Sequence, residues 1–210
     1  MHHWHSDRIS YYMHQTHYHY LNFWIPIRKP EAARSGLALI PMDRLAESAP
    51  RIERALFGRG AASIRDGRLA YEVDTHSYEE ACPFDPEALA VAPELAEGDA
   101  LVVRGDVLHR TQDTETSRVA ISLRAFDAER PLTQRALYTL TDGKLQRMLL
   151  APVPFATLIA GFWYWRATEI TGRQWEELRG KLRRGNPRAL ACFVAALACY
   201  RPLLKRHHRR

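Results

Sequence analysis

Two histidines and an aspartate stand at spacings that suit metal-assisted chemistry. His5 and Asp7 form a His-x-Asp pair near the start of the sequence, and His109 lies a hundred residues further on. In an extended segment, side chains two residues apart point to the same face, so one imidazole and one carboxylate converge on a single point. Two histidines and one carboxylate with open positions form the facial triad of non-haem Fe(II) oxygenases. We therefore predict that His5, Asp7 and His109 bind a metal.

Arg118 follows His109 by nine residues, across a turn between two apolar runs. These runs, Ala100–Val103 and Val119–Leu123, are rich in Val, Ile and Leu and are bounded by Gly, Asp, Thr and Ser. Both features are typical of buried or half-buried strands. A guanidinium at the far end of this turn can grip the carboxylate of a metal-bound cosubstrate through paired hydrogen bonds.

Ser122 and Arg124 share the face of Arg118 if the segment after it is a strand. Ser122 is small enough to leave room for a ligand and is expected to add a hydrogen bond to the cosubstrate. Arg124 is the competing candidate for carboxylate binding. The intervening apolar residues, Val119, Ile121 and Leu123, are expected to point the other way and to pack against an outer layer.

Five blocks of the sequence occur in an order and spacing that resemble a known family. The blocks are WHSD, LNFWIPI, SGLALIP, EGDALVV and HRTQDTETSRVAISL. Together they resemble the phytanoyl-CoA dioxygenase family of Fe(II)/2-oxoglutarate oxygenases over roughly residues 4–126. The resemblance implies a double-stranded β-helix, or jelly roll, of the cupin-like kind, in which His5, Asp7 and His109 bind Fe(II) and Arg118 binds 2-oxoglutarate.

The resemblance also implies a reaction, the hydroxylation of a small organic substrate with molecular oxygen while 2-oxoglutarate becomes succinate. Halogenating members of this superfamily have a small residue in place of the metal-binding carboxylate. Asp7 retains the carboxylate, so hydroxylation is expected. Family members usually carry a substantial segment before the His-x-Asp motif, and the oxygenase domain is expected to lack that part here. Nothing in residues 28–97 indicates the primary substrate.

Two alternatives remain open from the sequence. The first is a cupin metalloenzyme with His3, His5 and His109 as ligands and no 2-oxoglutarate. The second is a non-catalytic jelly-roll binding module whose basic tail recruits a partner. Iron content distinguishes the metalloenzymes from the binding module, and succinate release distinguishes the oxygenase from the cupin.

The residue pattern predicts a mainly β domain over residues 1–128 and a basic helical extension over residues 129–210. The predicted strands beyond those above are His19–Ile27, Leu37–Ile40 and Leu69–Val73, with a helix at Leu45–Phe57, a flexible connection at residues 58–67 and a loop at residues 78–93. The predicted helices of the extension are Thr133–Leu150, Phe155–Thr171, Gln174–Arg184 and Pro187–Leu204.

Charge and cysteine content indicate which partners and which cellular location to expect. The net charge of +6 comes from the end of the sequence, where residues from Arg166 onward carry twelve Lys or Arg against three Asp or Glu. Such a tail favours at most weak contact with a membrane surface or an acidic partner, and no nucleic-acid binding is expected. Three cysteines fit neither a disulfide framework nor a zinc site, and no signal peptide is present, so a cytoplasmic location is expected.

Overall fold

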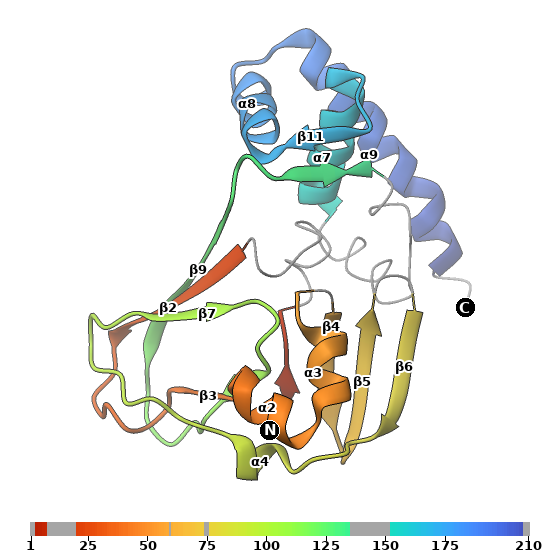
Figure 1. Cartoon of the computed structure of the whole chain (residues 1–210). Helices are drawn as coiled ribbons and strands as arrows, with labels where there is room; N and C mark the ends of the chain where they lie inside the picture. The colour runs from red at the N-terminus through yellow and green to blue at the C-terminus, as the bar shows by residue number, and fades with distance from the viewer. Residues whose placement is uncertain (1–2, 8–19, 59, 74–75, 135–151, 208–210) are drawn as a thin grey trace. The chain divides into compact units, whose positions relative to one another are not determined.

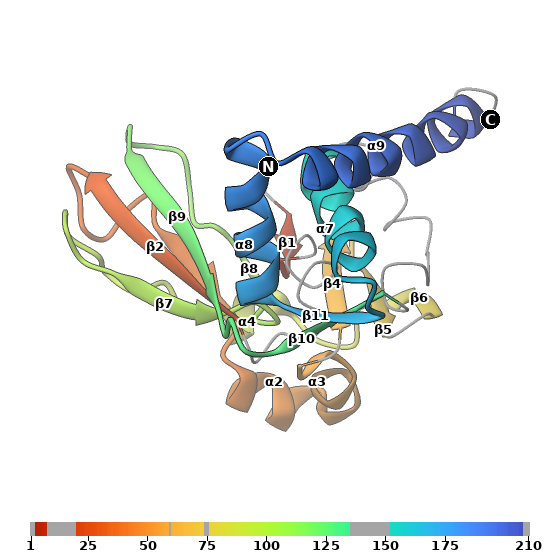
Figure 2. The ribbon, with the colours of Figure 1, turned by 90° about the horizontal axis from the view of Figure 1, so that it is seen from above.

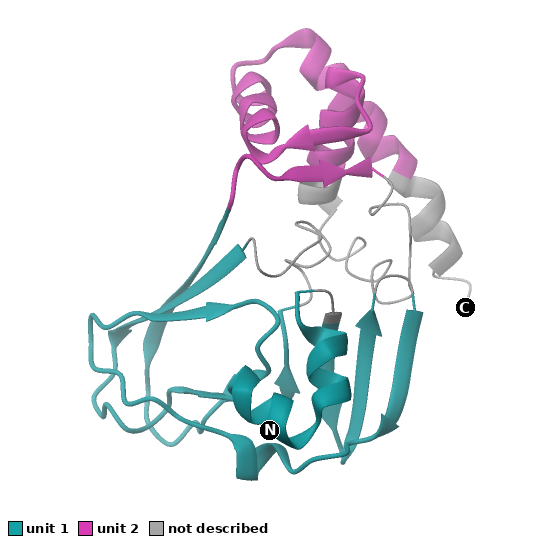
Figure 3. Cartoon of the chain, viewed as in Figure 1, with its two compact units in different colours: residues 1–126 teal, residues 127–210 magenta. Residues whose placement is uncertain are grey.

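The chain forms two compact units, residues 1–126 and residues 127–210 (Figure 3). The structure, a computed structural model, describes residues 3–7, 20–58, 60–73, 76–134 and 152–207. The first unit is mainly β and contains the predicted metal ligands, whereas the second is mainly helical.

Two antiparallel sheets make up the first unit (Figure 1). One has six strands in the order β3-β8-β1-β4-β5-β6, and the other has three in the order β7-β2-β9. The strands of the larger sheet are β1 (Trp4–His5), β3 (Leu37–Leu39), β4 (Gly60–Arg65), β5 (Arg68–Val73), β6 (His76–Ala81) and β8 (His109–Thr111). Those of the smaller sheet are β2 (Tyr20–Arg28), β7 (Leu101–Arg104) and β9 (Val119–Phe126), and Figure 2 shows β2 between its two neighbours.

The two faces of the six-stranded sheet have different roles. One face packs under two short helices, α2 (Met42–Ser48) and α3 (Pro50–Leu56), in a buried apolar cluster that includes Trp4. Because successive side chains of a strand alternate between faces, His5 lies on the opposite face from Trp4. The helix-covered core therefore fixes the strand that presents the first histidine.

The central strand of the three-stranded sheet, β2, is buried on one face and more exposed on the other. Along β2 the alternate residues Tyr20, Asn22 and Trp24 are buried. The other face carries the exposed apolar residues Leu21, Ile27, Val102, Val119, Ile121 and Leu123. With Val119 56% and Leu123 52% exposed, the predicted packing of these side chains against an outer layer is not found in the described part of the chain.

Several predicted elements are confirmed and several are wrong. The strands predicted in β2, β3, β5, β7 and β9 are all present. The single helix predicted at Leu45–Phe57 is instead two helices, because Pro50 begins a second helix directly after Ala49. The predicted loop at residues 78–93 contains most of β6 and a short helix, α4 (Pro86–Leu89), which Asp85 caps by accepting a hydrogen bond from the Glu87 N–H.

The predicted flexible connection at residues 58–67 is wrong because it contains strand β4. This strand pairs with β1 on one side and with β5 on the other. Asp66 and Gly67 make the turn to β5, and both have a positive φ, 48° and 71°. Positive φ at both central residues is the type I′ hairpin geometry that Asp-Gly favours, so the sequence did contain a signal for this hairpin.

The described part of the second unit contains a two-stranded sheet and three helices. These are β10 (Pro131–Thr133), α7 (Pro152–Trp165), β11 (Glu169–Thr171), α8 (Gly172–Arg183) and α9 (Pro187–His207). The predicted helix at Phe155–Thr171 ends early because Arg166 adopts a positive φ of 53° and the residues after it form β11. Most of the helix predicted at Thr133–Leu150 lies outside the described residues. No described helix is both long and apolar enough to cross a membrane.

Asp106 anchors the turn that connects β7 to the strand bearing His109. Its side chain is fully buried and accepts hydrogen bonds from the Gly58 N–H at 2.7 Å and from the Arg104 guanidinium. Next to it, the Gly105 carbonyl accepts a hydrogen bond from the Asp7 N–H at 3.0 Å. This turn therefore holds the backbone at the predicted metal ligand Asp7.

We expect the Asp106→Ala variant to lower the free energy of unfolding by about 2–4 kcal/mol, because a buried N–H and a partly buried cation lose their partner. Urea unfolding followed by circular dichroism measures the change. Asp99→Ala is the matched control, since exposed Asp99 also accepts a backbone hydrogen bond, and it should cost less than about 1 kcal/mol. Equal losses in the two variants would show that Asp106 is not an anchor.

Candidate metal centre

His5 and His109 lie directly opposite one another on neighbouring strands. They are register partners of β1 and β8, and their ring centroids are 4.6 Å apart. Directly opposed residues of antiparallel strands project to the same face of a sheet. The pairing thus brings together two imidazoles that are a hundred residues apart in sequence.

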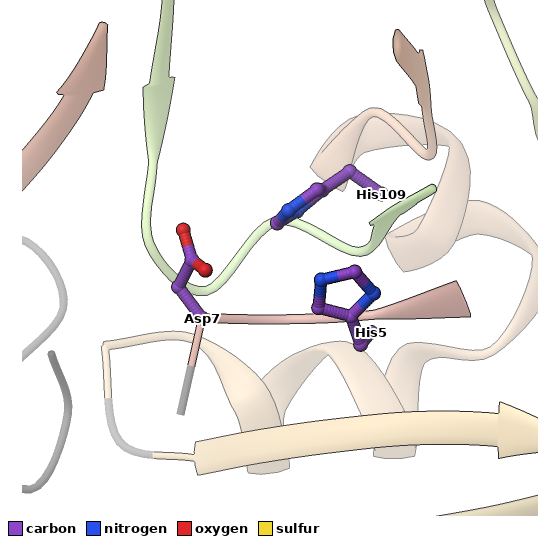
Figure 4. A group of neighbouring side chains, drawn as sticks. All are labelled: His5, Asp7 and His109. Atoms are coloured by element: carbon purple, nitrogen blue, oxygen red, sulfur yellow. The ribbon is translucent and has the colours of Figure 1, made fainter. Parts of the chain in front are cut away.

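Asp7 completes a group of three potential ligands. It follows His5 by two residues, and Figure 4 shows both side chains on the side of this segment that faces His109. One ligand atom from each residue lies within 4.8 Å of the other two. Imidazole nitrogens and carboxylate oxygens bind first-row metals at on the order of 2 Å, so small side-chain rotations suffice to bring all three to one ion.

Backbone carbonyls set the tautomer of both histidines. His5 Nδ1 lies 2.9 Å from the His3 carbonyl oxygen, and His109 Nδ1 lies 3.0 Å from that of Val107. A carbonyl oxygen only accepts, so each Nδ1 must carry the hydrogen and donate it. Each Nε2 therefore keeps its lone pair for a metal, which is the arrangement typical of metal-binding histidines.

The electrostatic surroundings keep His109 and Asp7 in the states that bind metals. Burial lowers the pKa of His109, which favours the neutral imidazole. Burial alone would raise the pKa of Asp7, but the charge that His109 carries when protonated, the charge of Arg124, and hydrogen bonds from Arg124 and Asn22 bring that pKa below its usual value. Asp7 is therefore ionised at neutral pH.

A cavity of about 170 Å³ adjoins this group, between the inner faces of the two sheets. From the six-stranded sheet and its flanks it is lined by Asp7, Leu37, Leu39 and His109, and from the three-stranded sheet by Asn22, Trp24, Val103, Ser122 and Arg124. The donor set is two imidazoles and one carboxylate, which suits Fe(II). The residues present therefore fit a non-haem iron ion with a small ligand beside it.

Arg118 and Ser122, the two residues predicted to bind the cosubstrate, differ in their position relative to the cavity. Ser122 lines the cavity. Arg118 donates hydrogen bonds to the Ser35 and Gly36 carbonyls and to Thr111 Oγ1, the last at 3.2 Å, and its guanidinium carbon lies 5.3 Å from the centre of the Trp24 ring. Arg118 is not among the residues that line the cavity.

Thr111 contacts Arg118 and lies on the same strand as the predicted ligand His109. It lies on β8 two residues after His109, so both side chains share a face and lie about 7 Å apart along the strand. The Arg118 guanidinium is hydrogen-bonded to Thr111. It is therefore separated from His109 by about the length of two residues along β8. Arg124, the competing candidate, lines the cavity, and its guanidinium nitrogen lies 3.1 Å from Asp7 Oδ1.

Sequence reasoning missed the polar residues that contact Asp7. Asn22 donates to Asp7 Oδ2, and the Tyr20 hydroxyl lies 3.4 Å from the same oxygen. A signal for Asn22 did exist, because an amide in the apolar run LNFWIPI is costly to bury unless it has a hydrogen-bond partner. Its partner could not be identified from the sequence.

The chain matches a known protein family. A family model described as phytanoyl-CoA dioxygenase (PhyH) matches residues 1–120, more than half of the chain. The match includes His5, Asp7, His109 and Arg118 and ends before Ser122. No curated protein and no solved structure matches.

Proposed function

The chain belongs to the phytanoyl-CoA dioxygenase family, and from that premise we propose that it is an Fe(II)/2-oxoglutarate-dependent dioxygenase that hydroxylates a small organic substrate. The observation that carries the proposal is the gathering of His5, Asp7 and His109 within 4.8 Å, with both imidazoles in the metal-binding tautomer. When bound, Fe(II) would activate O₂ as the oxidant and 2-oxoglutarate would supply two electrons by oxidative decarboxylation, so that one atom of O₂ enters a C–H bond as hydroxyl and the other enters succinate, with release of CO₂.

In this proposal three side chains would hold the iron. The Nε2 atoms of His5 and His109 and a carboxylate oxygen of Asp7 would bind Fe(II), and a three-ligand site of this kind would leave positions for small molecules. The bonds from Nδ1 to backbone carbonyls prevent the rings from turning. The jelly-roll connectivity expected for the family is part of the proposal, and the two facing antiparallel sheets support it.

Arg118 is proposed to bind the far carboxylate of 2-oxoglutarate, and Ser122 to add a hydrogen bond. The placement of the Arg118 guanidinium beside Thr111 supports this role. The length of a five-carbon dicarboxylate is about the distance along the strand from His109 to Thr111. A guanidinium has five N–H donors, so its three protein bonds leave donors for a carboxylate. Trp24, against which the guanidinium lies, forms part of the apolar wall that excludes water.

The alternative cupin site with His3 as a ligand receives no support from the described residues. His3 is absent from the ligand group, and its backbone carbonyl instead accepts the hydrogen of His5 Nδ1. We further propose a cytoplasmic location, with Cys82, Cys192 and Cys199 as free thiols. The basic tail is proposed to make at most weak contact with a membrane surface or an acidic partner, and no contact with nucleic acid.

Fe(II) is expected to raise the melting temperature of the protein. A ligand that binds only the native state at 100 times its Kd stabilises it by about 2.7 kcal/mol. For a chain of this size, that corresponds to a shift of about 5–10 °C. Anaerobic differential scanning fluorimetry measures the shift, with Mg²⁺ as the control ion. No shift with Fe(II), or an equal shift with Mg²⁺, would count against a selective metal site.

A further inference from the structure

Three side chains of the three-stranded sheet contact the Asp7 carboxylate. Arg124 donates to Oδ1 at 3.1 Å, Asn22 donates to Oδ2, and the Tyr20 hydroxyl lies 3.4 Å from Oδ2. Asp7 itself follows β1 of the other sheet. Both oxygens of the metal-binding carboxylate are therefore engaged by the opposite wall of the cavity.

Asn22 and Arg124 occupy matched positions on that wall. They are register partners on β2 and β9, and both side chains line the cavity on the inner face of their sheet. Their contacts with Asp7 thus arise from the pairing of two long strands, which places both donors at a fixed spacing opposite one carboxylate. Such a pair can hold the plane of a carboxylate more firmly than a single donor can.

Asn22 is poorly explained by packing alone. It is 7% exposed, in a strand whose other buried residues are mainly apolar, and its Oδ1 has no hydrogen-bond partner among the described residues. A buried amide with an unpaired oxygen costs free energy that an apolar residue at the same position would avoid. Its one hydrogen bond goes to Asp7, which points to a role at the carboxylate.

We propose that Asn22 and Arg124 form a carboxylate clamp, a pair of positioning residues that restricts Asp7 to binding the metal through one oxygen. The inference rests on the proposed function, because it takes Asp7 as a metal ligand. A carboxylate has about four acceptor sites, so one hydrogen bond on each oxygen still leaves a lone pair for a metal. The two bonds together oppose rotation of the carboxylate, which would be needed to turn both oxygens toward one ion.

The clamp has a consequence for the open positions of the site. A carboxylate that binds through both oxygens takes two coordination positions, whereas one that binds through a single oxygen takes one. The clamp therefore keeps one more position free for ligands from outside the chain. A purely structural ion pair between Asp7 and Arg124 would affect folding stability but not the coordination number of the bound metal.

Co(II) binding to the full-length protein tests the clamp, because Co(II) replaces Fe(II) at such sites and its visible absorption bands follow coordination number. Asn22→Leu, which keeps the size but removes the donor, should weaken Co(II) binding by about 10–100-fold and change the spectrum. Arg124→Met should also change the spectrum, and Arg124→Lys should restore it. Val103→Ala is the matched control, since Val103 pairs with Asn22, lines the same cavity and lacks a polar group, and it should keep the wild-type affinity and spectrum.

The outcomes show whether the clamp or the proposed metal site is wrong. If the wild-type protein binds no Co(II), the metal site itself is wrong. If the wild-type protein binds one equivalent but Asn22→Leu or Arg124→Met has the wild-type spectrum, the clamp is wrong and the metal site stands. Thermal melting of the metal-free variants checks folding, and should Asn22→Leu fail to fold, Arg124→Met and its Lys counterpart decide the question by their spectra.

Discussion

Replacing His109 with Ala should abolish stoichiometric Fe(II) binding while the first unit keeps its fold. The imidazole is one of three proposed ligands. The backbone of His109 pairs β8 with β1 and β3, and this pairing does not depend on the side chain. Loss of a group that merely orients a ligand costs about 10–100-fold in metal affinity, so loss of the ligand itself should cost more than about 100-fold. Anaerobic Fe(II) titration measures the affinity, and circular dichroism verifies the fold.

His76→Ala is the matched control for this experiment. His76 is an exposed histidine on β6 of the same sheet, outside the ligand group. Its replacement should leave Fe(II) affinity at the wild-type value. An unchanged affinity in His109→Ala would remove His109 from the site, and a similar loss in both variants would indicate nonspecific binding by histidines.

Replacing Arg118 with Leu should raise the 2-oxoglutarate concentration needed for half-maximal turnover by at least about tenfold. A charge-assisted hydrogen bond contributes roughly 1.5–3 kcal/mol, and about 1.4 kcal/mol corresponds to a factor of ten. Because Arg118 also donates to the Ser35 and Gly36 carbonyls, the variant must first be shown to bind Fe(II) as the wild type does. The titration is then made at saturating Fe(II).

Arg124→Leu serves as the comparison for Arg118→Leu. Arg124 contacts Asp7 and lies at the metal end of the cavity, so its loss should act mainly on the metal site. A large rise in the 2-oxoglutarate requirement for Arg124→Leu, with none for Arg118→Leu, would mean that the cosubstrate carboxylate binds Arg124 rather than Arg118.

The strands that hold the site were predictable because their residues alternate or cluster in ways that strands require. The apolar runs of β2, β7 and β9 predicted these three strands, and the Asp-Gly pair at Asp66 and Gly67 would have predicted the β4–β5 hairpin. Strand β4 was missed because its small residues, Ala61 and Ala62, carry little periodic signal although both are buried. Ala62 is buried in the apolar cluster beneath α2 and α3, and this packing is not visible in the residue pattern of β4 itself.

The candidate ligands were also predictable, whereas their supporting contacts were not. His5 and Asp7 are separated by one residue, so local geometry alone gives them a common face. The pairing of β1 with β8 and the contact of Asn22 with Asp7 depend on how strands from distant parts of the chain are arranged. The bonds from Arg118 to the Ser35 and Gly36 carbonyls likewise require a turn in which Ser35 has a positive φ of 51°, which no residue spacing predicts.

Formation of succinate under oxygen-18 gas is the most direct test of the proposed chemistry. The protein is loaded with Fe(II) without oxygen, mixed with 2-oxoglutarate and candidate substrates, and exposed to labelled O₂ beside the His109→Ala variant. The proposed function predicts iron-dependent succinate that carries one labelled oxygen atom, with little or none from the variant. Succinate no more abundant or more labelled in the wild type than in His109→Ala would contradict an Fe(II)/2-oxoglutarate oxygenase.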